Sequence, residues 1–309
     1  MRILVTGATG VVGQRLLPQL RAAGHDVTAA VRTPERAVEL SRAGIPARAA
    51  DLFSPYDLAT LMRGCDVVVN LATHIPPTPM AMFMPGAWHE NDRIRRIASA
   101  NLVFAALESG VRRFVQESFG LIYADHAHQW IDERMRVAPT RYNRSVLDAE
   151  RSAAHFTASG GAGVVLRFAA FYGPDATQTQ EMVKWLRKGW AMLPGVPDAY
   201  YSSVSHDDAA RAVVAALGLE PGVYNVADDE PLMRRDYFVA LAAALGLPQP
   251  RSMPGWMATM MGALGETLGR SQRISNRKLR SNSTWAPKYP SAREGLAAAV
   301  AQMSAPRAA

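Results

Sequence analysis

Short apolar runs alternate with amphipathic stretches along the first half of the chain. The runs predict strands at residues 3–5, 27–31, 66–70, 114–116 and 164–168, and a short strand ending near residue 50. The stretches between them predict helices at residues 14–23, 91–109 and 142–159, and two that open at Pro34 and Pro55. Strands that are apolar throughout, rather than at every second position, are buried on both faces. The pattern therefore predicts an α/β fold with a doubly wound, parallel, Rossmann-type sheet.

The regular alternation of strands and helices becomes less clear after Pro174. Helices are predicted at residues 180–188, 207–217, 235–245 and 257–268, with short strand-like pieces at 201–204 and 223–226. We interpret residues 1–173 as one domain built on this sheet and residues 174–309 as a smaller, mostly helical part. Segments near residues 201–226 can still return to the main sheet. The apolar segment 253–268 is interpreted as packing within the smaller part, with a lid, a subunit contact or a membrane-touching surface as alternatives.

Composition and charge narrow the class of protein. Hydrophobic residues make up 49% and charged residues 20% of 309, as in ordinary globular proteins. The single cysteine, Cys65, allows no internal disulfide, and no apolar run is long enough to span a membrane, so we expect a cytoplasmic protein. The net charge is +7, but the sequence carries no nucleic-acid-reading motif. The positive charge therefore favours an anionic cofactor instead. His126 and His128 lack a third ligand at a suitable spacing, so no metal site is predicted.

Three glycines mark the first strand-to-helix junction. Gly7, Gly10 and Gly13 follow the strand at residues 3–5 directly. Glycines at such a junction let the backbone turn tightly and approach a pyrophosphate, which then faces the N-terminus of the helix. We interpret the junction as a nucleotide-binding turn, with a purely structural turn as the alternative.

The spacing of these glycines and later motifs resemble one family. The motifs are Thr6-Gly7-Ala8-Thr9-Gly10-Val11-Val12-Gly13, Asn70-Leu71-Ala72-Thr73, Arg113-Phe114-Val115, Tyr142-Asn143-Arg144-Ser145, Phe171-Tyr172-Gly173-Pro174, His206-Asp207-Asp208 and Gly222-Val223-Tyr224-Asn225-Val226. Together they resemble the extended, epimerase/dehydratase-like branch of the short-chain dehydrogenase/reductase superfamily, over nearly the whole chain. The resemblance also implies a homodimer as a possible assembly.

The resemblance implies a nicotinamide dinucleotide as cofactor. The residues placed against it are Gly7, Thr9, Gly10, Val11, Val12, Gly13, Arg32, Asp51, Leu52, Leu71, Ala72, Thr73, Tyr142 and Phe168. The end of the second strand decides between NAD(H) and NADP(H), since a carboxylate there would repel a 2′-phosphate. Arg32 occupies this end and can form a forked contact with the phosphate, which favours NADP(H) over NAD(H). The alternative is that Arg32 only opens a solvated loop.

The catalytic positions depart from the family pattern. Tyr142 matches the tyrosine that donates a proton to the developing alkoxide, but Val146 stands where the family has lysine. Phe119 stands at the usual hydroxyl position, with Ser118 one residue before it, and Arg95 replaces an asparagine. Without an ammonium nearby, Tyr142 can donate a proton but is a poor base, so reduction is favoured over oxidation. We assign the catalytic candidates to Tyr142, Ser118 and His74.

Each of these three has a plainer interpretation. Tyr142 could be a structural phenol, Ser118 a helix cap, and His74 a hydrogen-bonded bystander in its loop.

The loop at residues 74–89 is rich in Met, Pro and aromatic residues. Loops at the carboxyl ends of parallel strands line the ligand site, and Met side chains adapt to apolar ligands. The candidate substrate-binding residues are His74, Met82, Phe119, Trp130, Phe171, Met182 and Trp185. They predict an apolar small molecule as substrate, with packing between the two parts as the alternative.

We therefore expect an NADPH-dependent oxidoreductase that reduces a carbonyl or an activated double bond. Two alternatives stay open: an NADP-bound epimerase or isomerase, and a non-catalytic protein that senses NADP(H).

Overall fold

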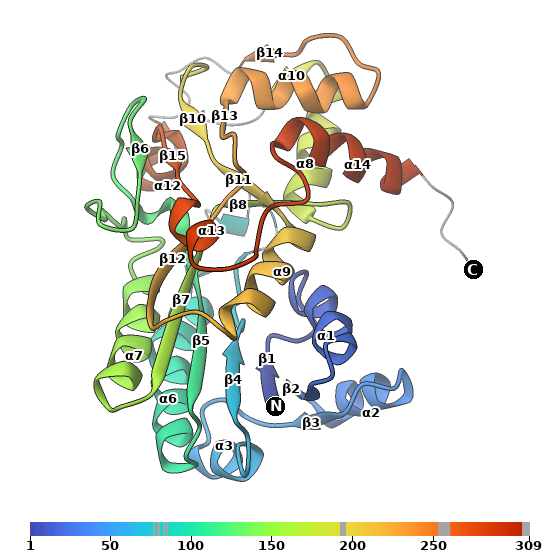
Figure 1. Ribbon diagram of the computed structural model, residues 1–309. Helices are drawn as coiled ribbons and strands as arrows, with labels where there is room; N and C mark the ends of the chain where they lie inside the picture. Colours follow the sequence, from blue (N-terminus) through green and yellow to red (C-terminus); the bar gives the residue numbers. More distant parts are fainter. Residues whose placement is uncertain are drawn as a thin grey trace.

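A seven-stranded parallel sheet forms the centre of the computed structural model, in the order β12-β7-β5-β4-β1-β2-β3 (Figure 1). The structure describes residues 1–76, 78, 81–82, 84, 86–191, 196–252 and 260–304. Helices cover both faces of the sheet (Figure 1). The doubly wound α/β fold that the apolar runs predict is thereby confirmed.

The strands of this sheet are short and mostly buried. They are β1 Arg2–Thr6, β2 Asp26–Val31, β3 Ala47–Ala49, β4 Val67–Asn70, β5 Arg113–Phe119, β7 Ala162–Phe168 and β12 Gly222–Val226. Two-residue and three-residue strands form four further pairs. These are β10 Tyr200–Tyr201 with β13 Leu232–Met233, β11 Ser203–Ser205 with β8 Ala170–Tyr172, β14 Arg251–Ser252 with β9 Trp190–Ala191, and β15 Arg273–Ile274 with β6 Trp130–Ile131.

Two apolar layers hold the helices against the sheet. One joins a face of the sheet to α1 Gly13–Ala22 and α9 His206–Ala216, and the other joins the opposite face to α3 Pro55–Leu61, α6 Ser99–Glu108 and α7 Val146–Ala158. The remaining helices are α2 Pro34–Arg42, α5 His89–Arg93, α8 Thr177–Leu186, α10 Arg234–Ala244, α12 Gly262–Gly269, α13 Arg277–Ser281 and α14 Ala292–Ser304, with the 3₁₀ turn η2 Gly120–Ile122. No helix in the described part of the chain is long and apolar enough to cross a bilayer.

The strand order reverses direction between β1 and β4. Val5 of β1 lies beside Ala29 of β2 on one side and Val69 of β4 on the other. In an open parallel sheet, ligands bind outside the carboxyl ends of the strands at such a switch point. The glycine-rich turn that follows β1 lies at this place.

Polar residues at helix starts explain where several helices begin. The Thr33 and Ser54 hydroxyls accept hydrogen bonds from backbone amides of α2 and α3, and Pro34 and Pro55 occupy the first helical positions. Such capping satisfies amides that have no partner within the helix, and proline already has the helical φ. The predicted starts of both helices are thereby confirmed.

Two predicted helices differ in detail. The helix expected at residues 91–109 is divided by a π-helical turn, η1 Ile94–Ala98, between α5 and α6. The helix expected from Tyr142 begins only at Val146, because Val146 donates to the Asn143 carbonyl in a tighter, three-residue turn. Tyr142 therefore lies in a turn before α7.

The second half of the chain contributes to the main sheet. Strand β12 pairs with β7, and α9 packs beside α1 (Figure 1). The strand expected at residues 201–204 is divided at Ser202, whose hydroxyl bonds to the Gln272 carbonyl and the Ile274 amide. Residues 253–259 of the apolar segment lie outside the described residues.

Candidate nucleotide and substrate site

Backbone crowding requires glycine at two positions of the turn. Gly7 has a φ of +65°, and a Cβ there would lie 2.3 Å from the Leu71 carbonyl oxygen. A Cβ on Gly13 would lie 2.4 Å from the Gly7 carbonyl oxygen. Gly10 is exposed, and its Cβ would meet only the Gly7 oxygen, at 3.3 Å. The inner side of the turn therefore packs closely against the end of β4, whereas its outer side, at Gly10, is exposed.

The helix behind the turn presents a positive end. The first turn of α1 holds no acidic residue, and Val12 at its start makes no side-chain cap. Within the described residues, the backbone amides of Val11 and Val12 have no acceptor. Unpaired amides and the helix dipole at this end favour an anion. The arrangement fits the pyrophosphate of a dinucleotide.

Arg32 extends the same edge of the sheet. It is exposed and follows β2, the strand next to β1. No acidic side chain in the described chain pairs with it. Asp51 lies at the end of β3 and accepts a hydrogen bond from the Phe53 amide, and the half-buried Leu52 follows it. The carboxyl ends of β1, β2 and β3 thus carry the residues expected around the adenosine half.

A buried amide organises the end of β4. Asn70 is fully buried; its Oδ1 accepts from the Thr6 hydroxyl at 2.6 Å and from the Ala72 amide at 3.2 Å. Its Nδ2 donates to Gln116 at 2.9 Å. The Leu71 amide also donates to the Thr6 carbonyl at 3.3 Å, so Leu71 and Ala72 lie beside the turn. Thr6 and Asn70 both belong to the motifs quoted from the sequence, as polar residues that end otherwise apolar strands.

Tyr142 lies between an aromatic ring and a guanidinium. Its ring centroid is 5.8 Å from that of Trp88, and its hydroxyl accepts a hydrogen bond from Arg141 Nη2 at 2.6 Å. Trp88 Nε1 in turn donates to the Met82 carbonyl at 3.1 Å. The segment containing Met82 and Trp88 is therefore anchored beside Tyr142. Sequence reasoning missed both Trp88 and Arg141, because neither position carries a family signal.

An apolar residue, Val146, occupies the position where the family has lysine. Val146 is fully buried at the start of α7. Valine carries no charge, and the only positive group bonded to the phenol in the described chain is Arg141.

Ser118 belongs to a buried polar network. Its hydroxyl donates to Glu150 at 2.5 Å, and Glu150 also accepts two hydrogen bonds from Arg167. Arg167 continues to the Tyr123 hydroxyl, and burial raises the pKa of that phenol to about 12. Burial alone would lower the pKa of Arg167, yet its bonds to Glu150 raise it. Ser118 itself is fully buried, and its hydroxyl is engaged in this network.

Arg95, which stands where the family has asparagine, forms a second buried pair with Glu117. Arg95 lies in the π-helical turn η1 and donates to Glu117 at 2.9 Å. Their side chains are only 3% and 10% exposed. Arg95 is therefore neutralised by Glu117, and it does not contact Tyr142 in place of lysine.

His74 follows the end of β4 and is exposed. Its backbone amide donates to Oδ1 of the buried Asn91 at 3.0 Å. Asn91, which sequence reasoning missed, thus fixes the backbone of His74 while the imidazole remains accessible.

The predicted substrate residues fall into two groups. Met182 lies in the apolar layer on one face of the sheet, and Phe119 and Phe171 pack against this layer. The ring of Phe171 is 5.3 Å from that of Phe168, a predicted cofactor residue. Trp130 contacts a different part of the chain: the Arg273 guanidinium lies 4.0 Å from the centroid of its ring. Trp185 is half-buried beside Lys188. Of the predicted substrate residues, Phe119, Phe171 and Met182 thus lie in or against one apolar layer, which does not include Trp130 or Trp185. Met80 and Phe83 of the loop lie outside the described residues.

Known proteins provide an independent comparison. A family model described as NAD(P)H-binding matches residues 7–219, more than half of the chain. The chain belongs to this NAD(P)H-binding family. The 3-diazoavenalumate denitrifying reductase of a Streptomyces species is 34% identical, over 96% of this chain and 99% of its own. The 2-alkyl-3-oxoalkanoate reductase of Shewanella oneidensis is 27% identical, over 86% and 72% respectively.

Solved structures show the same fold. The human epimerase family protein SDR39U1, solved with NADPH, superposes with a TM-score of 0.81 at 20% identity, covering 97% of this chain and 99% of its own. The fold is the one that the resemblance to the extended short-chain dehydrogenase/reductase superfamily implies. The NAD(P)H-binding family and the reductases similar to this chain support an NAD(P)-dependent oxidoreductase, without deciding between NADPH and NADH.

Proposed function

We propose that this protein is an NADPH-dependent reductase acting on a carbonyl or activated double bond of an apolar small molecule. The observation that carries the proposal is the open turn at Gly10, with the free helix end of α1 behind it and Arg32 beside it. When bound, NADPH supplies a hydride. Gly7, Gly10 and Gly13 accommodate the pyrophosphate, and Arg32 pairs with the 2′-phosphate.

Tyr142 donates the proton that completes reduction of a carbonyl. The Arg141 guanidinium at its hydroxyl stabilises the phenolate left behind, as the family lysine does elsewhere. His74, accessible at the end of β4, provides a second polar contact for the substrate. We assign Ser118 to the support of Glu150 and Arg167, because its hydroxyl is committed there.

The apolar substrate class rests on the composition of the site wall. Phe119 and Phe171 are only partly buried, and they offer an apolar surface at the carboxyl end of β5 and just beyond that of β7. The similar Shewanella reductase acts, by its name, on an oxoalkanoate with an alkyl substituent. A ketone with a long alkyl or aryl body is the substrate class that we would screen first.

Nucleotide titration tests the cofactor assignment. We expect NADPH to bind more tightly than NADH, and Arg32→Gln to weaken NADPH binding about tenfold, the scale of a lost charge-assisted contact. NADH binding should change little. Arg42→Gln, at an exposed arginine in the last turn of α2, is the control. Equal losses for both nucleotides would contradict the assignment of Arg32.

A second candidate reaction is favoured by the apolar residues at two proton-relay positions. Phe119 and Val146 stand where the family has a hydroxyl and an ammonium, so two of the groups that usually assist proton transfer are missing. The name of the similar Streptomyces reductase describes reductive loss of nitrogen from a diazo compound. In an aryl diazonium substrate, a new C–H bond replaces the C–N bond, whose electron pair leaves with N₂. This reduction consumes one hydride and needs no proton donor.

Tyr142→Phe separates the two candidates. With a ketone substrate, we expect kcat to fall by about a hundredfold or more, the scale of general acid catalysis. With an aryl diazonium salt and NADPH, arene and N₂ formation should continue at nearly the wild-type rate. A large loss in both reactions would remove the second candidate, and no loss in either would remove the assignment of Tyr142.

A further inference from the structure

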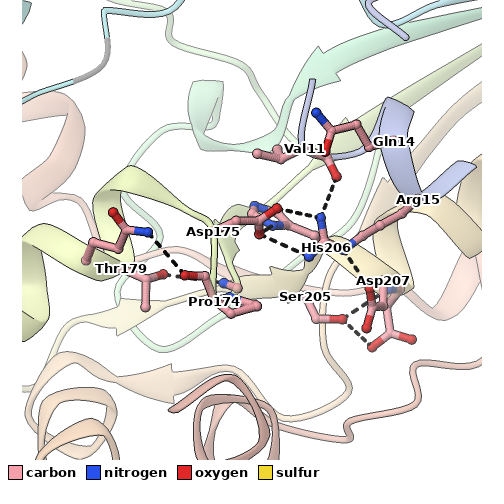
Figure 2. A network of polar contacts seen from close by, with 12 residues as sticks. Val11, Gln14, Arg15, Pro174, Asp175, Thr179, Ser205, His206 and Asp207 are labelled. Atoms are coloured by element: carbon pink, nitrogen blue, oxygen red, sulfur yellow. Dashed lines mark hydrogen bonds and ion pairs between the residues drawn. The ribbon is translucent and has the colours of Figure 1, made fainter. Parts of the chain in front are cut away.

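A cluster of four charged or titratable side chains lies behind the nucleotide turn. Arg15 of α1 contacts Asp175 after β8 and Asp207 of α9, and His206 of α9 contacts the same Asp175 (Figure 2). These residues come from three segments that are far apart in the sequence. None of them is among the residues expected to bind cofactor or substrate.

Arg15 connects the cluster to the turn. Its Nη1 donates to the Val11 carbonyl at 2.9 Å, and its Nε donates to Asp207 at 2.7 Å (Figure 2). Nη1 and Nη2 form a two-point contact with the Asp175 carboxylate at 2.9 and 3.0 Å. The side chain of Arg15 is 20% exposed, so it has little freedom to leave this position. The direction of the Val11 peptide therefore depends on where the two carboxylates hold the guanidinium.

Asp175 connects the cluster to the substrate side. Its Oδ1 contacts Nδ1 of the buried His206 at 3.1 Å. The His206 ring in turn lies edge-on to Phe171, with centroids 5.5 Å apart. Phe171 precedes Asp175 by four residues and belongs to the proposed substrate wall. A continuous series of contacts thus joins Val11 to Phe171.

The contacts are of unequal strength. Asp175 and Asp207 are 44% and 41% exposed, and isolated ion pairs at such positions contribute little to stability. The two-point geometry and the sharing of Asp175 between a guanidinium and an imidazole make this contact stronger than a single surface pair. His206 first and then Arg15 hold the pKa of Asp175 well below its ordinary value. The carboxylate therefore stays charged throughout the neutral range.

We infer that Arg15, Asp175 and His206 form a positioning cluster that sets the nucleotide turn and the Phe171 wall in one arrangement, so that nucleotide affinity depends on Asp175. This inference rests on the proposed nucleotide site. Asp175 contacts the turn only through Arg15 within the described residues. Two sites joined by such contacts influence each other's affinity reciprocally.

A double-mutant cycle on NADPH binding tests the inference. We expect Arg15→Gln to raise the Kd for NADPH about tenfold and Asp175→Asn to raise it about fivefold, within the usual range of coupling between sites. The double variant should be no weaker than Arg15→Gln alone, because both substitutions break the same connection. Arg15→Lys should restore part of the affinity, since lysine keeps the charge but loses the two-point contact. Arg21→Gln, at an exposed position of α1, is the matched control.

Thermal unfolding of the same variants excludes a merely structural role. A lower Tm with unchanged NADPH affinity would overturn the inference, as would fully additive losses in the double variant. Asp175→Asn is nearly isosteric and half-exposed, so it remains informative if Arg15→Gln folds poorly. Failure of the unmodified protein to bind NADPH would instead overturn the proposed function itself.

Discussion

At Tyr142, the charge that the family places four residues later comes from the preceding residue. Arg141 is exposed and donates directly to the phenol, whereas Val146 is buried. We expect Arg141→Met to lower kcat for ketone reduction about tenfold with little change in KM, because the bond matters most as the phenolate forms. Arg141→Lys should recover part of the loss. Steady-state kinetics checks this, with the exposed Arg144→Met as control; an equal loss in the control would contradict it.

Ser118 provides a second prediction at the residue scale. Its hydroxyl donates to Glu150, which keeps its two bonds to Arg167 when Ser118 is removed. We expect Ser118→Ala to lower the free energy of unfolding by about 1 kcal/mol, the usual net value of one hydrogen bond. Denaturant unfolding measures this. If kcat instead falls a hundredfold with unchanged stability, Ser118 acts in catalysis.

At the scale of the element, the glycines of the turn between β1 and α1 serve two different purposes, tight packing and an open surface. A Cβ on Gly13 would collide with the Gly7 carbonyl, so Gly13→Ala should lower stability by about 1–3 kcal/mol, as overpacking does elsewhere. Gly10→Ala meets only one atom, at 3.3 Å, and should unfold nearly as the wild type does. Both should weaken NADPH binding. Thermal unfolding beside nucleotide titration distinguishes them, and normal NADPH binding by Gly10→Ala would show that the open surface faces no phosphate.

At the scale of the whole molecule, the net charge of +7 attracts anionic ligands. NADPH carries a 2′-phosphate that NADH lacks, so its binding should weaken more when salt is raised from about 50 to about 500 mM, which shortens the screening length. Titrations at several salt concentrations measure both slopes. The difference between the nucleotides should shrink in Arg32→Gln; identical slopes in the unmodified protein would argue against a phosphate contact there.

Acid stability also belongs to this scale, because Asp175 joins three segments. Its contacts with His206 and Arg15 lower its pKa below the ordinary value of 3.8. A carboxyl with a lowered pKa in the folded state stabilises the protein fully above its unfolded-state pKa, and this contribution is lost as pH falls through the folded-state value. We therefore expect Tm to decline below about pH 4, and to decline less in Asp175→Asn. Equal declines in both proteins would place the acid sensitivity elsewhere.

The amino-acid sequence by itself determined the layered sheet and the nucleotide turn. Uninterrupted apolar runs such as residues 67–69 are typical of strands buried between two layers of helices, and three glycines directly after the first strand predict a tight turn. Both properties depend on local patterns, and they were readable before any coordinates. The sequence also showed that valine and phenylalanine, at positions 146 and 119, replace the lysine and the hydroxyl residue of the family.

Tertiary structure alone decided which side chains meet. Ser118 donates to Glu150 of α7, and Arg95 is neutralised by Glu117. Arg15 meets Asp175 and Asp207 across more than 150 residues of sequence. Contacts of this kind depend on how helices pack on the sheet, and no periodicity or spacing along the chain encodes them.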